Sequence, residues 1–287
     1  MNSLYIVLLV LAALFIICIG IVLFDICTFK TTNYSLTNSK VTKEYSFVVI
    51  SDLHGWRFGR GSRRLIARID ALKPDGIIIA GDMLTSSVHT RPEKMSFLLN
   101  ELAKRYQIYY GMGNHEERLN RMTYRFGTTF LRYKQLLKGS GIHFLMNECL
   151  ELPEYNIRIY GLMLTNDYFI RFGKKPLKKD AIIRKIGSAS QTKCNLLIAH
   201  NPEYFPEYAD WGDSIVLSGH NHGGIIGIPF VGGLISPKFT FFPKYDGGKY
   251  EEKGSIMLLS RGLGTHTIPI RFLNRAELLY VKLKPEE

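Results

Sequence analysis

The sequence is poor in cysteine, with four cysteines among 287 residues. Cys18 lies inside a long apolar run near the N-terminus, and Cys27 follows that run closely. Only Cys149 and Cys194 remain for the rest of the chain. Two cysteines give no disulfide framework, so the chain must be held together by a conventional hydrophobic core.

Charge is absent from the 21 residues between Leu4 and Phe24. At 1.5 Å per residue such a helix is about 30 Å long, which matches the hydrocarbon core of a bilayer. We therefore expect residues 1–25 to form a transmembrane anchor. A cleavable signal peptide is the alternative, but the run exceeds the usual apolar core of about 7–15 residues. It also has no basic residues before it and no small-x-small site after it.

The side of the membrane that the domain faces is left open. Only Asn2 and Ser3 precede the apolar run after Met1, whereas Lys30, Lys40 and Lys43 follow it. The positive-inside rule alone would place the domain in the cytoplasm, but long domains can be translocated regardless of charge.

The remaining chain divides into a polar linker and one large domain. Residues 26–45 are rich in Thr, Ser and Asn without helical periodicity, which is typical of a linker. Residues 46–287 suit a single α/β domain. Candidate helices from Arg60 to Leu72 and from Pro92 to Arg105 alternate with strands, and short strand-like runs dominate after Gly139. This order predicts a sheet-on-sheet arrangement flanked by helices.

Acidic residues are scarce beside basic ones, with 25 against 37 and a net charge of +12. Basic and aromatic residues alternate in two clusters, from Arg118 to Lys138 and from Arg171 to Lys179. Next to a membrane span these clusters favour contact with anionic headgroups, although a merely solvated basic face is the simpler alternative. We find no recognisable nucleic-acid-binding motif, so no specific nucleic acid is expected as a partner.

Five polar motifs stand directly after, or within a few residues of, apolar runs of strand length. The runs are residues 46–50, 76–80, 106–110, 195–199 and 214–218. The motifs are Asp52-Leu53-His54, Gly81-Asp82, Gly113-Asn114-His115-Glu116, Ala199-His200-Asn201-Pro202 and Gly219-His220-Asn221-His222. Five of the eight histidines fall inside them. Because polar groups that follow neighbouring strands meet at one rim of a sheet, these motifs are expected to converge.

The residue types in the motifs indicate a metal site. The candidate ligands are Asp52, His54, Asp82, Asn114, His200, His220 and His222. They offer nitrogen and oxygen without thiolate, which suits two divalent ions such as Mn, Fe, Zn or Co. Seven ligands are too many for one tetrahedral ion, so we expect two ions with Asp82 as the shared carboxylate. Such a site would attract an anionic phosphoryl group and acidify a water, while His115 could protonate the departing oxygen.

The motifs resemble those of the calcineurin-like metallophosphoesterases, whose pattern runs D-x-H, G-D, G-N-H-[DE], a lone His and G-H-x-H. The resemblance extends from about Phe47 to about Lys284 and implies a four-layer α/β/β/α sandwich. It also implies that the first metal is held by Asp52, His54, Asp82 and His222. The second metal would be held by Asp82, Asn114, His200 and His220. His115 matches the family's acid or transition-state stabiliser.

The segment from Ser260 to Leu283 also resembles a bacterial membrane-anchored subgroup that includes enzymes of phosphorylated glycolipids such as UDP-diacylglucosamine. This resemblance implies a single-pass protein of the bacterial plasma membrane, with Arg261 and His266 as substrate-binding residues. The chain departs from the subgroup after the last motif, where Ile225 and Gly227 replace polar positions. The substrate of those relatives is therefore not assigned to this chain.

Three functions are consistent with these features. The first is a membrane-tethered hydrolase of a phosphate ester or pyrophosphate, acting on a lipid or a nucleotide-linked glycolipid. The second is a protein or nucleotide phosphatase tethered only for location, and the third is a non-catalytic binding module. The glycine- and aromatic-rich residues 223–248 could form an apolar lip for a lipid tail, or a hairpin whose aromatics pack into the domain. Monoester, diester and pyrophosphate substrates stay open, as does the oligomeric state.

Overall fold

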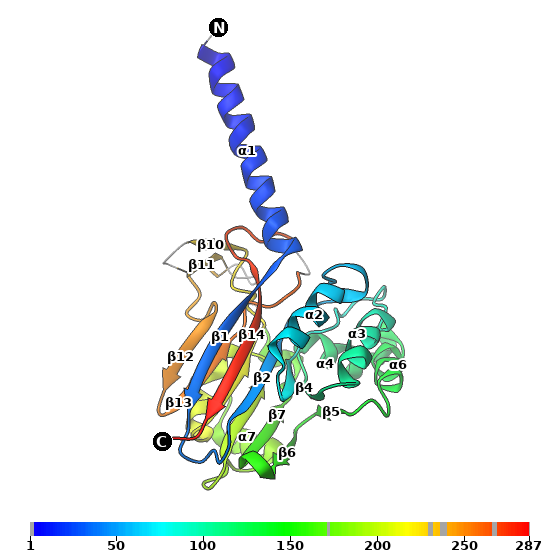
Figure 1. The fold of residues 1–287 in the computed structure, drawn as a ribbon, viewed down its shortest axis with the longest axis vertical. Helices are drawn as coiled ribbons and strands as arrows, with labels where there is room; N and C mark the ends of the chain where they lie inside the picture. Colours follow the sequence, from blue (N-terminus) through cyan, green and yellow to red (C-terminus); the bar gives the residue numbers. More distant parts are fainter. Residues whose placement is uncertain (1–2, 171–172, 229–231, 236–239, 266–268, 287) are drawn as a thin grey trace.

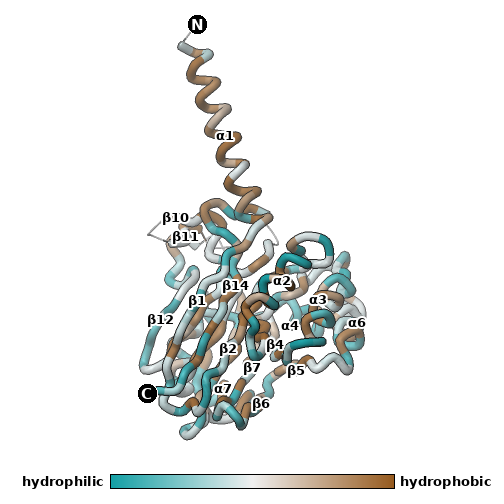
Figure 2. Tube along the Cα trace, viewed as in Figure 1, coloured by the Kyte–Doolittle hydropathy of each residue, from teal (hydrophilic) through white to brown (hydrophobic). Residues whose placement is uncertain are grey.

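The computed structural model describes residues 3–170, 173–228, 232–235, 240–265 and 269–286, and it consists of one long helix attached to a layered domain (Figure 1). The helix α1 (Ser3–Cys27) projects away from the domain, and its most apolar stretch buries nothing against the rest of the chain. Figure 2 shows it as a nearly continuous apolar rod. A core helix would be covered, so α1 suggests a single-pass membrane anchor, although a signal sequence has similar length and composition.

The anchor and the domain are joined without a flexible connection. Asp25 is buried near the end of α1, and its carboxylate accepts a 3.0 Å hydrogen bond from the backbone N–H of Asn274. Arg64 donates to the carbonyl of Cys27 at 3.2 Å, and Arg275 donates to the Thr28 hydroxyl at 2.9 Å. The last turn of α1 is therefore fixed to the domain surface.

The strand β1 (Phe29–Thr37) begins two residues after α1 ends and pairs in parallel with β14 (Ala276–Lys284) from end to end. The expected linker over residues 26–45 is therefore wrong between Phe29 and Thr37. A strand at a sheet edge needs only one apolar face, and Leu36 and Tyr34 supply it by packing into the core, while Ser35 and Thr37 are exposed. The polar composition concealed this pairing.

The first sheet has six strands in the order β1-β14-β2-β3-β4-β5. Its other strands are β2 (Tyr45–Ile50), β3 (Gly76–Ala80), β4 (Gln107–Gly111) and β5 (Ile142–Leu145). Strands β2 to β5 are parallel, whereas β14 runs antiparallel to β2. The helices that follow these strands are α2 (Arg63–Leu72), α3 (Glu93–Ala103), α4 (Asn114–Arg121), α5 (Thr123–Phe126) and α6 (Thr129–Leu136), with a short 3₁₀ turn at Arg60–Ser62.

The second sheet also has six strands, in the order β12-β13-β9-β8-β7-β6. Their bounds are β6 (Glu148–Leu152), β7 (Ile157–Leu162), β8 (Cys194–Ala199), β9 (Ile215–Ser218), β12 (Gly248–Glu252) and β13 (Ser255–Leu259). The accompanying helices are α7 (Lys179–Ile186) and α8 (Phe205–Trp211), with 3₁₀ turns at Pro153–Tyr155, Asn166–Tyr168 and Pro202–Tyr204. A small hairpin of β10 (Ile226–Ile228) and β11 (Gly232–Ile235) lies near the base of α1 (Figure 1).

Three apolar cores separate the layers. The central core joins the two sheets and includes Phe47, Val49, Ile78, Ile198 and Leu217. One outer core lies between the first sheet and helices α2, α3, α4 and α6, and the other between the second sheet and α7 and α8. The predicted four-layer α/β/β/α sandwich is confirmed, and so are the helices expected from Arg60 and Pro92. Strands β2 and β3 are buried on both faces, which explains their unbroken apolar sequences.

The segment 223–248 agrees in part with each of the two expectations, an exposed apolar lip and a hairpin whose aromatics pack into the domain. Within its described residues it forms the β10–β11 hairpin, and Tyr245 is buried among aromatic neighbours. Phe241 and Phe242, however, keep 66% and 61% of their surface exposed. The hairpin therefore packs partly into the domain and leaves an apolar edge.

Because β1 is part of the sheet, we expect a chain that starts at Lys40 to be less stable than one that starts at Asp25. The shorter chain leaves β14 as an exposed edge and removes Lys30 and Thr32 from the buried Glu277. Thermal unfolding of the two purified chains checks this, and the shorter one should have the lower Tm and aggregate more readily. Equal Tm values would mean that residues 25–39 behave as a linker after all.

Candidate metal centre

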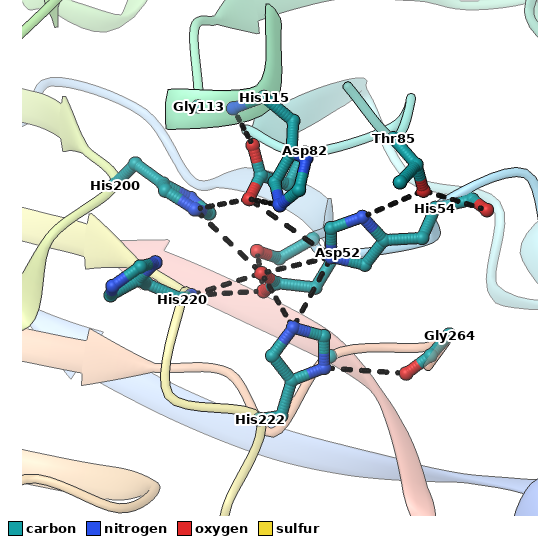
Figure 3. A network of polar contacts seen from close by, with 12 residues as sticks. Asp52, His54, Asp82, Thr85, Gly113, His115, His200, His220, His222 and Gly264 are labelled. Carbon is teal, nitrogen blue, oxygen red and sulfur yellow. Dashed lines mark hydrogen bonds and ion pairs between the residues drawn. The ribbon is translucent and has the colours of Figure 1, made fainter. Parts of the chain in front are cut away.

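The five motifs come together at one end of the two facing sheets (Figure 3). Asp52 follows β2, Asp82 follows β3 and Asn114 follows β4 in the first sheet. His200 follows β8 and His220 follows β9 in the second. Parallel strands bring their carboxyl ends to the same edge, so residues distant in sequence meet in one pocket, as expected.

Two buried carboxylates form the centre of this pocket. The Oδ2 atom of Asp82 lies 3.0 Å from Nε2 of His200 and 4.0 Å from Nε2 of His54. The Oδ1 atom of Asp52 lies 3.4 Å from Nε2 of His222 and 3.9 Å from Nε2 of His54. Each carboxylate thus faces imidazole nitrogens from both sheets.

The candidate ligand atoms form groups compact enough to hold metal ions. Asp52, His54 and His222 make one group, and Asp82, His200 and His220 make another, with all ligand atoms of a group within 4.8 Å of one another. Asp82 also groups with His54, so it reaches residues of both sets. This geometry supports Asp82 as the shared ligand.

Hydrogen bonds fix which ring nitrogen of two histidines faces the pocket. Nδ1 of His200 lies 2.6 Å from the carbonyl of Ala80, and Nδ1 of His222 lies 3.3 Å from the carbonyl of Gly264. A carbonyl only accepts, so each Nδ1 donates and each Nε2 keeps a lone pair when the ring is neutral. In addition, Oδ1 of Asn114 is buried without a hydrogen-bond partner among the described residues. These three atoms have the chemistry of metal ligands.

His115 is held in the opposite tautomer. Its Nδ1 accepts a 2.8 Å hydrogen bond from the backbone N–H of Ser86, so the proton of the neutral ring is on Nε2. That Nε2 lies 4.0 Å from Oδ2 of Asp82. A protonated nitrogen cannot bind a metal, so His115 is a donor at the edge of the pocket although it lies within ligand range.

The two buried carboxylates of the pocket need positive charge nearby to stay ionised. Burial raises the pKa of Asp52 to about 6, with His200 lowering it and Asp82 raising it further. Burial would also raise the pKa of Asp82, but the adjacent His200 holds it well below its usual range. Burial lowers the pKa of His200, yet Asp82 and Asp52 outweigh this effect and raise it to about 10. A proton on His200 thus supplies part of the charge that cations would supply.

Five of the pocket residues have left-handed backbone conformations. The φ angles are 51° at Asp52, 50° at His54, 55° at Asp82, 74° at His220 and 53° at His222. Such conformations cost on the order of 1–3 kcal/mol for a non-glycine residue and persist only where the surroundings enforce them. Their concentration here indicates that the loops are shaped to aim side chains into the pocket.

Two motif glycines are required by close approach. A Cβ atom on Gly113 would lie 2.1 Å from Oδ1 of Asp82. One on Gly219 would lie 2.0 Å from the Ser51 hydroxyl and 2.3 Å from Oδ2 of Asp52. The glycines of the GNHE and GHNH motifs therefore make room for the two carboxylates.

Glu116 has a structural role that the sequence did not reveal. Its carboxylate accepts from the backbone N–H groups of Asp82, Leu84 and Gly113 at 2.8, 2.9 and 3.1 Å. It also accepts from the hydroxyl of Tyr110 at 3.0 Å. Burial and the nearby Asp82 raise its pKa to about 7. Glu116 thus clamps the Asp82 loop to the Gly113 loop, and its place in the GNHE motif was the only available signal.

Arg271 and Asn274 hold the loop that carries His222. Arg271 is fully buried and donates to the carbonyls of Gly264 at 2.8 Å and Gly262 at 3.1 Å. The side chain of Asn274 donates to the carbonyls of His222 at 2.7 Å and Gly224 at 2.6 Å. Both residues lie in the segment from Ser260 to Leu283 that resembles the membrane-anchored subgroup, but sequence reasoning assigned neither of them a role.

The remaining predicted residues are placed less centrally. The Arg261 side chain lies beside Gly223 and Gly247, next to the loop of His222, and its binding role stays a prediction. His266 lies outside the described residues. His143 contacts Gln107 and stacks on Tyr109, as expected of a structural histidine. His89 lines a cavity that opens beside His54.

This cavity is about 290 Å³ in volume and has a basic wall. Its lining includes His54, Thr85, His89, Arg91 and Lys94. It therefore offers positive charge next to the candidate ligands, where an anionic substrate could extend from the pocket.

The four-layer fold and this oxygen–nitrogen ligand cluster define a metal-dependent phosphoesterase. A profile of the calcineurin-like phosphoesterases matches residues 45–224, which is more than half of the chain. The chain belongs to the calcineurin-like phosphoesterase family and is a metal-dependent hydrolase of phosphoric esters.

Several relatives have similar sequences. The chain is 25% identical to an uncharacterized metallophosphoesterase, YkuE, of Bacillus subtilis, over 89% of this chain and 85% of the relative. It is 28% identical to the phosphodiesterase YaeI of Escherichia coli, over 67% of this chain and 66% of the relative. A transmembrane protein with a metallophosphoesterase domain from Danio rerio is 25% identical over 83% of this chain, which spans only 52% of that relative.

Replacement of Asp82 by Ala should remove both metals or leave them weakly bound, because Asp82 reaches both ligand groups. Metal analysis of the purified variant checks this, and activity should fall to background. Asp75→Ala is the matched control, because Asp75 lies at the other end of β3 and bonds only Ser46 in the described residues. Two tightly bound ions in the Asp82 variant would refute the bridging role.

Proposed function

We propose that this protein is a membrane-tethered phosphoesterase with two divalent metal ions, drawn from Mn, Fe, Zn and Co, and that it hydrolyses a phosphate ester or pyrophosphate bond. The observation that carries the proposal is the position of Asp82 between two compact ligand groups. Two ions would use all seven candidate ligands, and a single ion would leave several buried polar atoms without a role.

The ligands divide between two ions as the family resemblance implies. Asp52, His54 and His222 would hold the first ion, and Asn114, His200 and His220 the second, with Asp82 shared. Ions bound there would acidify a water for attack on phosphorus and would polarise the phosphoryl oxygens. No protein nucleophile is required.

We assign His115 as a hydrogen-bond donor to a phosphoryl oxygen. Its Nδ1 accepts the Ser86 amide proton at 2.8 Å and lies 2.9 Å from the Ser86 hydroxyl, which can donate to the same nitrogen. The ring is thereby favoured as the neutral form with Nε2–H directed at the pocket. Neutral imidazole is too weak an acid to protonate a leaving group, so we favour transition-state stabilisation over general acid catalysis.

The basic cavity supports a substrate that carries a second anionic group. Arg91 and Lys94 lie beyond His54 and have no ion pair among the residues that the structure describes. A phosphodiester or pyrophosphate extending from the pocket would place its far phosphate or headgroup against them. The name of the Escherichia coli relative is consistent with a diester.

In its more specific form, the proposal is that the substrate is linked to a lipid. The rigid junction of α1 with the domain supports an enzyme that works at the bilayer surface. The exposed Phe241 and Phe242 also support it, because they pair with β11, which lies near that junction (Figure 1). A nucleotide or protein phosphatase tethered only for location remains the second candidate, and the same metal ligands would serve it.

Hydrolysis of matched substrates by the full-length, metal-loaded protein tests the proposal. We expect turnover of an aryl diester or a nucleotide-linked pyrophosphate. The double variant Arg91→Gln/Lys94→Gln should raise KM for these substrates about tenfold with little change in kcat, since a lost charged hydrogen bond is worth about 1.5–3 kcal/mol. Lys178→Gln/Lys179→Gln on the far side of the domain is the control. Absence of hydrolysis with metals bound would favour a binding module.

His115→Ala should keep its metals and lose about 10²–10³-fold in kcat, as found when one donor to a developing oxyanion is removed. The loss should be similar for aryl and alkyl esters, because a donor to the phosphoryl oxygen serves both equally. His115→Gln retains an N–H donor and should recover part of the rate. A much larger loss on the alkyl ester, whose leaving group needs a proton, would instead indicate general acid catalysis.

A further inference from the structure

Basic side chains gather around the base of α1. Four exposed arginines, Arg57, Arg60, Arg63 and Arg64, come from the loop after β2 and the start of α2. Arg64 donates to the carbonyl of Cys27, the last residue of α1. A fifth residue, Arg275, precedes β14 and places its guanidinium over the ring of Phe24 at 4.7 Å. We call these five residues the arginine collar.

The collar lies at the depth where the apolar run ends. Phe24 is the last residue of the uncharged run, and one face of its ring contacts the Arg275 guanidinium. When α1 spans a bilayer, the end of the run lies at the boundary between hydrocarbon and headgroups. Figures 1 and 2 show the polar start of α2 close to this end of the apolar helix. Arg64 and Arg275, which contact the end of α1, are therefore held at the level of lipid phosphates, and Arg57, Arg60 and Arg63 come from the adjoining loop and the start of α2.

The collar has no acidic partner of its own. Among the described residues, no carboxylate forms an ion pair with any of the five arginines. Three of them, Arg57, Arg60 and Arg63, line a groove of about 610 Å³ that also contains Phe97, 53% exposed. The two acids of this groove are already paired: Asp70 with Arg105 at 3.0 Å, and Glu101 with Lys104 at 2.5 Å.

Each of the two basic clusters that the sequence emphasised contains basic residues paired with acids. In the cluster ending at Lys179, of which residues 171–172 lie outside the described part, Lys174 pairs with Glu207 and Lys175 with Asp167. In the other cluster, Arg121 pairs with Glu117 and Arg132 with Glu93. The helix α7, which begins at Lys179, lies at the end of the domain opposite α1 (Figure 1).

We propose that the arginine collar binds the phosphates of anionic lipids in the leaflet from which α1 emerges. Guanidinium groups suit phosphate because they donate paired hydrogen bonds in a fixed plane. Phe97 on the groove wall, and Ile270 and Leu273 near the buried Asn274, expose apolar surface for the upper part of the lipid. Together with the Asp25–Asn274 contact, bound lipids fix the domain on the membrane in one orientation.

The test uses the full chain in phosphatidylcholine vesicles that contain spin-labelled phosphatidylglycerol or spin-labelled phosphatidylcholine. The fraction of motionally restricted label gives the relative affinity for the two lipids. We expect a severalfold preference for phosphatidylglycerol that weakens as salt rises, because exposed charges are screened beyond about 10 Å at 0.1 M ionic strength. In the triple variant Arg57→Gln/Arg60→Gln/Arg63→Gln the preference should fall close to one.

A control variant removes the same charge elsewhere. Lys178→Gln/Lys179→Gln/Arg184→Gln alters exposed residues at and around α7 and should keep the wild-type preference. Thermal unfolding of both variants verifies that they are folded. The proposal is overturned if the collar variant keeps the preference or if the control loses it equally. Loss of the preference on adding millimolar inorganic phosphate at constant ionic strength would also overturn it, and would assign the groove to a soluble anion.

Discussion

The repulsion between two buried carboxylates is the constraint on which the site depends. Asp52 and Asp82 lie in one pocket with almost no solvent exposure, and burial raises the pKa of Asp52 to about 6. Like charges at such depth are stable only with cations beside them. Imidazoles from the second sheet supply part of the positive charge, since the pKa of His200 is raised to about 10. Two metal ions would supply the rest.

The surrounding structure keeps the carboxylates in this unfavourable arrangement. Glu116 fixes the loops of Asp82 and Gly113, while Arg271 and Asn274 fix the loop of His222. These contacts hold the left-handed backbone of Asp82 and of His222 in place. Because Asn274 also donates to Asp25 at the end of α1, this helix and the candidate metal centre share one support. The end of the apolar helix is thus part of the domain's architecture.

The sequence predicted the layers of the fold and the convergence of the five motifs, because both follow from local patterns. Apolar runs followed by polar motifs identify strand ends, and parallel strands then bring Asp52, Asp82 and His200 together. The pairing of β1 with β14 was missed because it joins residues about 250 positions apart and its polar sequence lacks a strand pattern. The His115 tautomer and the arginine collar were missed because each depends on neighbours that only the folded chain brings near.

The most direct test of the central claim is the position of the metals themselves. We expect crystals of the protein grown with Mn²⁺ to give two anomalous peaks about 3.5–4 Å apart, one on each side of the Asp82 carboxylate. The first should contact His54 and His222, and the second His200 and Asn114, with His115 bound to neither. A single peak, or a peak coordinated by Nε2 of His115, would contradict the account.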